Sequence, residues 1–204
     1  GFDTRGAHLV RVQRPAALSP STYVIADSRE GWVGALRALL ESYAHGTAPV
    51  EFDYSLVRPA GSPIRGFGGI ASGPGPLREL LEATRAVLES NAGQPVSVTT
   101  IVDIMNMVGK CVVAGNVRRT AEIAFGDPRS DEYIDLKNYE VNPHRMAYGW
   151  TSNNSVFAEL GMDYEPLVRR IVANGEPGFA WLENMREYGR MNGVPDRSDW
   201  RASG

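Results

Sequence analysis

The sequence predicts an α/β fold, because segments with apolar residues at helical spacing alternate with short apolar runs of strand length. Of the 204 residues, 43% are hydrophobic, which is enough to form a sizeable core. Connections in such folds are usually short, but this chain contains one long glycine-rich segment. That segment either has a functional explanation or counts against the expected elements.

The first part of the chain is expected to contain a helix between two strands. Residues 8–14 alternate apolar and polar side chains, as a half-buried strand does. A helix is expected to start at Asp27 and Ser28, where either side chain can cap exposed amides, and to end at Gly46. Residues 50–57 then predict a strand.

The rest of the chain continues the alternation. Pro76 opens an expected helix that runs to Ser90, and another begins near Ser97. The remaining expected elements are a strand at 121–125, a helical turn at 130–138, a strand with a polar centre at 147–157, a helix at 163–174 ended by Gly175, and a strand at 178–182.

The glycine- and proline-rich segment, residues 58–76, cannot be the interior of a regular helix or strand. A surface linker is one interpretation. However, Ile64, Phe67 and Ile70 are spaced through the glycines, and Arg65 lies among them, which a linker does not require. These residues favour an ordered ligand loop, because glycine lets backbone amides approach a phosphate closely.

Two other polar stretches contain candidate binding residues. The stretch 115–119 (GNVRR) places arginine forks, which pair with phosphates or base edges, beside residues that permit unusual turns. A solvated surface turn explains it equally well. The stretch 153–155 (NNS) lies in an expected strand, where buried amides need partners, so we interpret it as a pocket wall. An exposed turn is the alternative.

Charge and composition argue against several classes of protein. The 21 basic and 24 acidic residues give a net charge of −3, which argues against a general nucleic-acid binder but not against binding one nucleotide. The single cysteine, Cys111, excludes an internal disulfide and is expected to be a buried structural thiol. No histidines have metal-ligand spacing, and no apolar run approaches the roughly 20 residues of a membrane span. A cytoplasmic setting is expected.

Several stretches, taken together and in order, resemble ribonucleotide reductases, most closely the monomeric adenosylcobalamin-dependent ribonucleoside triphosphate reductases. They are DSREGW (27–32), GFGGIASGPGPL (66–77), GKCVVAGNVRRTAEIAFG (109–126), SNNSV (152–156) and NGEPGF (174–179). Each is modest evidence alone, but the resemblance covers nearly the whole chain in matching order. RPAGSPIRG (58–66) is also similar to the iron-dependent branch.

The resemblance implies a ten-stranded α/β barrel made of two antiparallel five-stranded halves. Residues 1–204 would form one partial barrel domain with the effector site, the specificity loops and part of the substrate site. It also implies reduction of ribonucleotides to deoxyribonucleotides with adenosylcobalamin, whose contacts are expected outside this segment. The implied partners are a ribonucleotide substrate, deoxynucleoside triphosphate effectors and the rest of the reductase polypeptide, with neither nucleic acid nor membrane.

The resemblance also implies residue roles. Asp27 and Ser28 match the helix start that holds the effector's ribose and base. Residues 61–75 match the first effector loop, where Arg65 is expected to pair with triphosphate oxygens. The glycines expected to contact the effector are Gly66, Gly68 and Gly69. The specificity loop, in which Arg118 would reach the substrate, is Gly115, Asn116, Val117, Arg118 and Arg119. The substrate pocket would include Asn153, Asn154 and Ser155.

The chain also departs from the family pattern. The radical-bearing cysteine belongs to an NPCGE-type motif, which is absent and expected just beyond Gly204, and Cys111 matches no working cysteine of the family. The chain is therefore expected to be an internal segment without catalytic residues. Residues 14–27 look shorter than the corresponding region of the monomeric members, in which an insertion supplies the partner's effector-site contacts. Its loss would predict a homodimer that packs through the helices at 27–45 and 76–90.

Two other interpretations stay open. One is a non-catalytic nucleotide-binding regulatory module or a split-gene subunit, which the following coding sequence would distinguish by the presence or absence of the cysteine motif. The other is an unrelated α/β phosphate-binding domain, which needs a glycine loop leading from a strand into a helix. Residues 66–76 do precede an expected helix.

Overall fold

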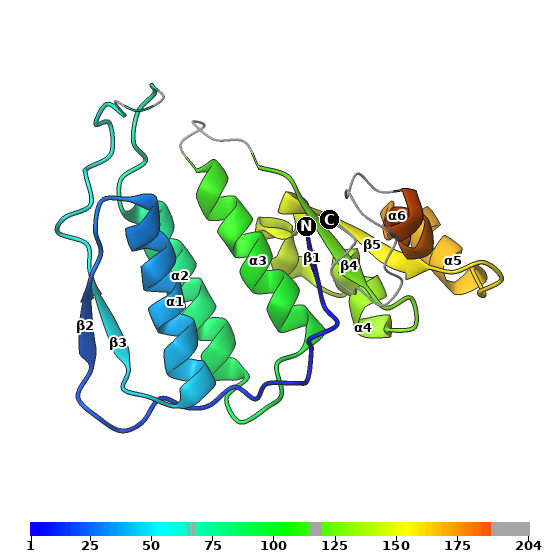
Figure 1. Ribbon diagram of the computed structural model, residues 1–204, viewed down its shortest axis with the longest axis horizontal. Coiled ribbons are helices and arrows are strands. Elements are labelled where there is room, and N and C mark those ends of the chain that lie inside the picture. The colour runs from blue at the N-terminus through cyan, green and yellow to red at the C-terminus, as the bar shows by residue number, and fades with distance from the viewer. Residues whose placement is uncertain (65, 67, 115–119, 189–204) are drawn as a thin grey trace. The chain divides into compact units, whose positions relative to one another are not determined.

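The structure, a computed structural model, describes residues 1–64, 66, 68–114 and 120–188 (Figure 1). The chain divides into two compact units. The first, Gly6–Thr120, is called here the helical unit. The second combines Gly1–Arg5 with Ala121–Gly204 and is called the sheet unit. Each unit is described by itself.

The helical unit contains α1 (Arg29–His45), α2 (Gly75–Ser90) and α3 (Val98–Val113). Ser28 caps α1 and Ser97 caps α3, and each Oγ accepts a hydrogen bond at 3.0 Å from the amide three residues further on. The predicted bounds of α1 and the predicted end of α2 are confirmed, and α2 and α3 begin within one residue of the predicted positions. Local sequence is enough to predict these helix starts, because each cap residue accepts a hydrogen bond from a first-turn amide that has no partner within the helix.

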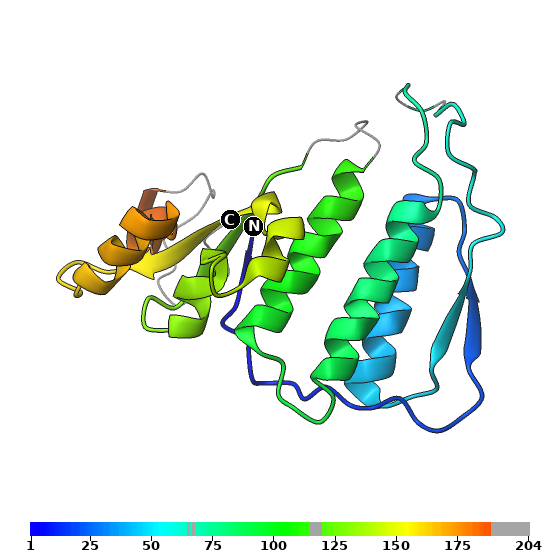
Figure 2. The same cartoon turned by 180° about the vertical axis from the view of Figure 1, so that it is seen from behind.

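Helix α2 packs against both α1 and α3, as Figures 1 and 2 show from opposite sides. The core between the helices consists of fully or almost fully buried aliphatic side chains: Leu39, Leu77, Leu80, Leu81, Leu88 and Val102. Burying a side chain of this size contributes roughly 1.5–3 kcal/mol, so this interface is the main source of the unit's stability.

A parallel pair of strands accompanies the helices. β2 (Ser21–Val24) pairs with β3 (Val50–Asp53), with Ser21 opposite Val50. β3 is shorter than predicted, because the carboxylate of Asp53 accepts a 2.8 Å hydrogen bond from the amide of Ser55 and turns the chain.

The predicted strand at 8–14 is wrong. Apart from one isolated bridge between Arg11 and Pro95, the segment belongs to no strand pair. Its backbone bonds to the turn before α3 instead, for example from the amide of Val12 to the carbonyl of Gln94 at 2.9 Å. Of the apolar side chains in this segment only Val12 is buried, whereas Leu9 and Val10 are exposed, so the alternation in the sequence indicated neither a half-buried face nor membership of a sheet.

The sheet unit has one four-stranded parallel sheet in the order β1-β4-β5-β6. The strands are β1 (Phe2–Asp3), β4 (Glu122–Gly126), β5 (Ser152–Ala158) and β6 (Gly178–Trp181). The predicted α/β class and the last three strands are confirmed. β5 begins later than predicted, because residues 143–147 and 149–151 form short 3-10 turns.

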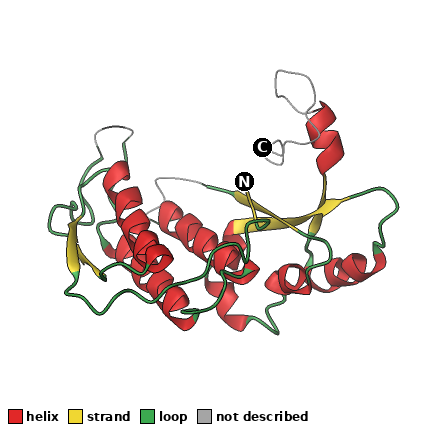
Figure 3. Ribbon diagram, turned by 60° about the horizontal axis from the view of Figure 1, so that its bottom comes forward, coloured by secondary structure: helices red, strands yellow, loops and turns green. Residues whose placement is uncertain are grey.

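Helices α4 (Asp131–Ile134) and α5 (Glu165–Asn174) follow β4 and β5, and α6 (Leu182–Tyr188) follows β6. Figure 3 shows α5 on one side of the yellow sheet and α6 continuing from the end of β6. The buried ring of Tyr133, from α4, marks this side, because its hydroxyl lies 2.7 Å from the Ala124 carbonyl and 2.9 Å from that of Ser155. Tyr133 thus bridges the two central strands.

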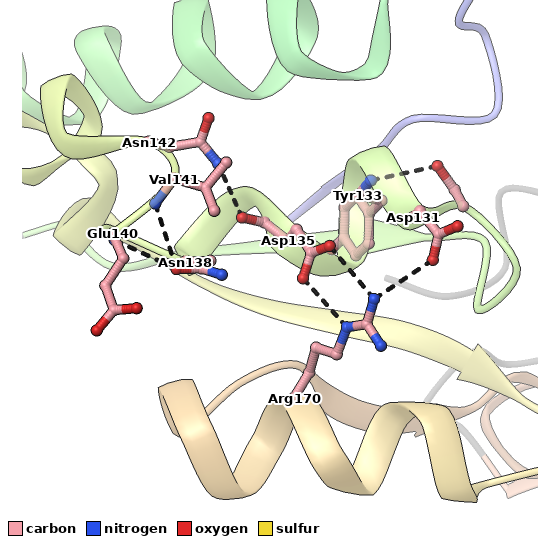
Figure 4. A network of polar contacts seen from close by, with 9 residues as sticks. Asp131, Tyr133, Asp135, Asn138, Glu140, Val141, Asn142 and Arg170 are labelled. Carbon is pink, nitrogen blue, oxygen red and sulfur yellow. Dashed lines mark hydrogen bonds and ion pairs between the residues drawn. The ribbon is translucent and has the colours of Figure 1, made fainter.

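A polar network ties α5 to the segment after β4 (Figure 4). The guanidinium of Arg170 donates to both carboxylate oxygens of Asp135, at 3.2 and 3.4 Å, and lies 3.6 Å from Asp131. The side-chain amide of Asn142 donates to the Asp135 carbonyl at 3.0 Å. Such partly exposed ion pairs contribute little to stability one by one, but this network fixes how α5 lies against its neighbours.

Candidate functional site

A cavity of about 490 Å³ opens in the helical unit, a volume that suits a small-molecule ligand. It is bounded by the first half of α1, the start of α2, the end of α3 and the glycine-rich segment. The lining residues from the helices are Trp32, Val33, Leu36, Leu77, Leu80, Val108, Cys111 and Val112. The polar and loop residues include Asp27, Ser28, Arg29, Arg58, Ile64, Ile70, Ser72 and Gly73.

The glycine-rich segment forms an ordered hairpin in its described residues. Pro63 bridges Ile70, and the amide of Ile64 donates to the carbonyl of Gly69 at 3.0 Å. Gly73 has a positive φ of 73°, and a Cβ there would fall 2.7 Å from the Ala60 nitrogen, so a larger residue does not fit. These contacts among the described residues favour a folded loop over a surface linker, and the binding of a ligand by this loop stays a prediction.

The structure places both helix-start residues of the predicted effector site at the cavity. The Oγ of Ser28 is occupied as the α1 cap. The carboxylate of Asp27 accepts a hydrogen bond at 2.6 Å from Nε of Arg58, and both side chains are about one-third exposed, 32% and 38%. The Asp27–Arg58 pair thus joins the start of α1 to the start of the glycine-rich segment.

Arg58 is a cavity residue that sequence reasoning missed. Its position directly after a predicted strand, at the first residue of the glycine-rich segment, was the available signal. The prediction looked instead to Arg65, which lies outside the described residues, as do residues 115–119. Gly66, Gly68 and Gly69 are exposed and are not among the residues that line the cavity.

Cys111 lies in the cavity wall. Burial, together with the nearby Glu79 carboxylate, raises the pKa of its thiol to about 11. The thiol therefore stays protonated and unreactive at neutral pH, as expected of a structural cysteine.

The predicted substrate-pocket residues lie in β5 and not in an exposed turn. Asn154 is 2% exposed, and its Oδ1 accepts a 2.9 Å hydrogen bond from Ser152. Gly126, which pairs with Val156, touches Tyr133, so Asn154 shares the helix-covered face of the sheet with them. Asn153 and Ser155 point to the opposite face. The alternation of side chains along β5 therefore separates Asn154 from Asn153 and Ser155, which were predicted to line one pocket.

A buried polar cluster lies around the start of β5. Nζ of Lys137, in a side chain that is 9% exposed, donates to the Ser152 carbonyl at 2.5 Å and lies 3.4 Å from the carboxylate of Glu176. That carboxylate also accepts the amide of Asn154 at 3.1 Å. Burial lowers the pKa of Lys137, and the charge of Glu176 counters this effect. The cluster connects β5 to the turn before β6.

In the described part of the chain, no helix has the length and apolarity needed to cross a membrane. The same residues contain no group of three or more side chains placed to hold a metal ion.

Comparison with known proteins identifies the family. A family model described as "B12-dependent ribonucleotide reductase, insertion domain" matches residues 10–88. An adenosylcobalamin-dependent ribonucleoside-triphosphate reductase of Euglena gracilis is 53% identical over 100% of this chain. The chain belongs to the adenosylcobalamin-dependent ribonucleotide reductases. A probable reductase of the same name from Dictyostelium discoideum is 50% identical over 98% of the chain.

A solved structure agrees with this family. The crystal structure of a B12-dependent, class II ribonucleotide reductase superposes with a TM-score of 0.73 and 35% identity, over 88% of this chain and 26% of that one. The chain spans 28% of the length of the Euglena and Dictyostelium reductases. The parallel α/β arrangement thus occurs in a solved member of the family.

The match to the insertion domain bears on one expectation. The predicted homodimer rested on a shortened region at residues 14–27. The insertion-domain model of the B12-dependent reductases matches residues 10–88, which include this region. The homodimer stays a prediction.

Proposed function

We propose that the protein containing this chain reduces ribonucleotides to deoxyribonucleotides, and that the cavity of the helical unit binds a deoxynucleoside triphosphate effector. One observation carries the assignment of the cavity. A carboxylate, Asp27, and a guanidinium, Arg58, are paired at an otherwise largely apolar cavity of about 490 Å³. A nucleotide offers matching groups: sugar hydroxyls, phosphates and a flat base.

Each group has a chemical partner in the cavity. The carboxylate of Asp27 accepts hydrogen bonds from the sugar hydroxyl. Arg58 pairs with phosphate oxygens through its planar fork, and Arg29 adds positive charge beside it. Because Asp27 already holds Arg58 in place, little side-chain entropy is lost when the ligand binds.

The specificity loop and the substrate site extend this proposal. Val112 and Ala114, from the end of α3, line the cavity, and the chain continues directly into residues 115–119. A bound effector that favours one conformation of this loop would change which ribonucleotide substrate Arg118 accepts. Arg65 in the effector loop keeps its predicted role within the proposal, as does the ten-stranded barrel. Because β5 directs Asn154 to one face and Asn153 and Ser155 to the other, only one of these two sets can line the substrate pocket.

Adenosylcobalamin is the cofactor named for the relatives. The described residues do not fit it, because a corrin with its axial groups is several times larger than a nucleotide, and the cavity measures about 490 Å³. The described histidines, His8, His45 and His144, are all exposed on the surface. We therefore assign no described residue to the cofactor and propose that the protein binds it elsewhere.

Replacing Arg58 with alanine tests the cavity assignment. The variant loses a charge-assisted contact and leaves Asp27 unpaired beside the phosphates, so the Kd for dGTP or dTTP, measured by calorimetry, should rise about 10- to 100-fold. Arg37→Ala is the matched control, because Arg37 is a 75% exposed α1 residue that pairs with Glu41 away from the cavity. Absence of deoxynucleotide binding by the unaltered protein, or equal weakening in both variants, contradicts the proposal.

A further inference from the structure

We infer that Trp32 is the residue on which the effector's base stacks, and that the cavity orients the nucleotide with its base against the apolar wall and its phosphates at Arg58. This inference rests on the proposed function and adds the residue that recognises the base. It concerns a side chain to which neither the sequence motifs nor the comparisons give a role.

The cavity lining is divided in a way that suits such an orientation. Its charged groups, Asp27, Arg29 and Arg58, all come from the start of α1 and the start of the glycine-rich segment. The part contributed by α3 consists of Val108, Cys111, Val112 and Ala114, where the thiol is protonated and the other side chains are aliphatic. A nucleotide has the same division between a charged end and a flat, weakly polar end.

Trp32 stands at the junction of these two regions. It follows the cap residue Ser28 by four positions, which is about one helical turn, so both lie on the same face of α1. Leu36 continues this stripe into the cavity. The indole therefore lines the same cavity as the Asp27–Arg58 pair, one helical turn after the residue that caps α1.

The indole of Trp32 is available for stacking. It is half-buried, and it is the only aromatic side chain among the described residues that line the cavity. Among the described residues, no other aromatic ring packs against it. An indole that lines a cavity and has no aromatic neighbour among the described residues can stack on a planar ligand, and every nucleobase has a flat face for such a stack.

Substitution of Trp32 tests the inference with dGTP and inorganic triphosphate as separate probes. Loss of a base–aromatic stack should raise the Kd for dGTP about 10- to 100-fold in Trp32→Leu. Trp32→Phe, which keeps a ring, should bind closer to the unaltered protein. The affinity for inorganic triphosphate, which has no base, should not change in either variant. Trp150→Leu is the matched control, because Trp150 is 58% exposed and lies in the sheet unit.

The outcomes separate this inference from the proposal on which it rests. If Trp32→Leu binds dGTP as tightly as the unaltered protein while Arg58→Ala binds it more weakly, the proposal that the base stacks on Trp32 is wrong. The proposal that the cavity is the effector site is then supported. The stack is equally wrong if Trp32→Leu weakens inorganic triphosphate as much as dGTP. If the unaltered protein binds no deoxynucleotide, both are wrong.

A second measurement leaves Trp32 unchanged and so does not depend on how its variants fold. In a protein in which every tryptophan except Trp32 is replaced by phenylalanine, including Trp150, Trp181 and Trp200 of this chain, the tryptophan emission comes from Trp32. Stacking of a base should quench this emission saturably with dGTP and leave it unchanged with inorganic triphosphate. Emission that does not respond to a saturating concentration of bound dGTP overturns the inference.

Discussion

Replacing Gly126 with alanine is expected to destabilise the sheet unit by about 3 kcal/mol, the upper part of the usual range for overpacking a core. A Cβ at Gly126 would lie 2.3–2.4 Å from three carbons of the Tyr133 ring. The ring cannot move aside freely, because Tyr133 is 1% exposed and its hydroxyl is held between the carbonyls of Ala124 and Ser155. Urea unfolding measures the loss.

Two controls distinguish this clash from a general effect of losing a glycine. Gly75→Ala makes the same change at the start of α2, where a Cβ meets nothing within 4 Å, and should leave stability unchanged or slightly raised. In a Tyr133→Leu background the clash is relieved, so Gly126→Ala should cost much less there. Additive effects of the two substitutions would show that the packing of Tyr133 on Gly126 is not the cause.

Replacing Glu176 with glutamine is expected to cost about 2–3 kcal/mol of stability. The change keeps an oxygen that can accept the Asn154 amide but leaves the buried ammonium of Lys137 without its counter-charge. Removing one partner of a buried ion pair usually lowers the free energy of unfolding by more than the intact pair contributes to it. Because Glu176 is 22% exposed, we expect a loss at the lower end of the range for buried pairs. Urea unfolding of the two proteins gives the difference.

The pH dependence provides a sharper signature of Glu176→Gln. Burial already lowers the pKa of Lys137 from its ordinary 10.5, and loss of the carboxylate lowers it further. Between the folded-state pKa and 10.5 the unfolded chain binds more protons, so stability rises with pH there. The difference in free energy of unfolding between Glu176→Gln and the unaltered protein should therefore be smaller at about pH 10 than at about pH 7. Glu165→Gln, at a surface pair with Arg169 on α5, should show neither effect.

The helices and most strands could be predicted from the sequence because their signals are local. Ser28 and Ser97 mark helix starts through bonds to amides three residues away, and Gly46 and Gly175 end helices in the left-handed conformation that glycine accepts easily. β2 was missed because a short, mostly exposed strand flanked by proline has no distinctive pattern of its own. Its pairing with β3 defines it.

The candidate site was only partly predictable, for a related reason. Asp27 and Ser28 were found because they belong to a recognisable helix start. Arg58 acquires its role through a contact with Asp27, 31 residues earlier, and a single sequence does not reveal such pairs. In β5, successive side chains point to opposite faces of the sheet, so Asn153 and Asn154 are on different sides. The interpretation of the polar stretch as one pocket wall did not take this alternation into account.

Hydrogen–deuterium exchange of the protein with and without dGTP tests most directly whether the helical unit holds the effector. Ligand binding should slow exchange at the first turns of α1 and at the Ile70–Gly73 segment, where backbone amides border the cavity. Helix α5 in the sheet unit, Glu165–Asn174, serves as the internal reference and should not change. Under conditions where dGTP is bound, unchanged exchange around the cavity, or protection confined to the sheet unit, would contradict the account.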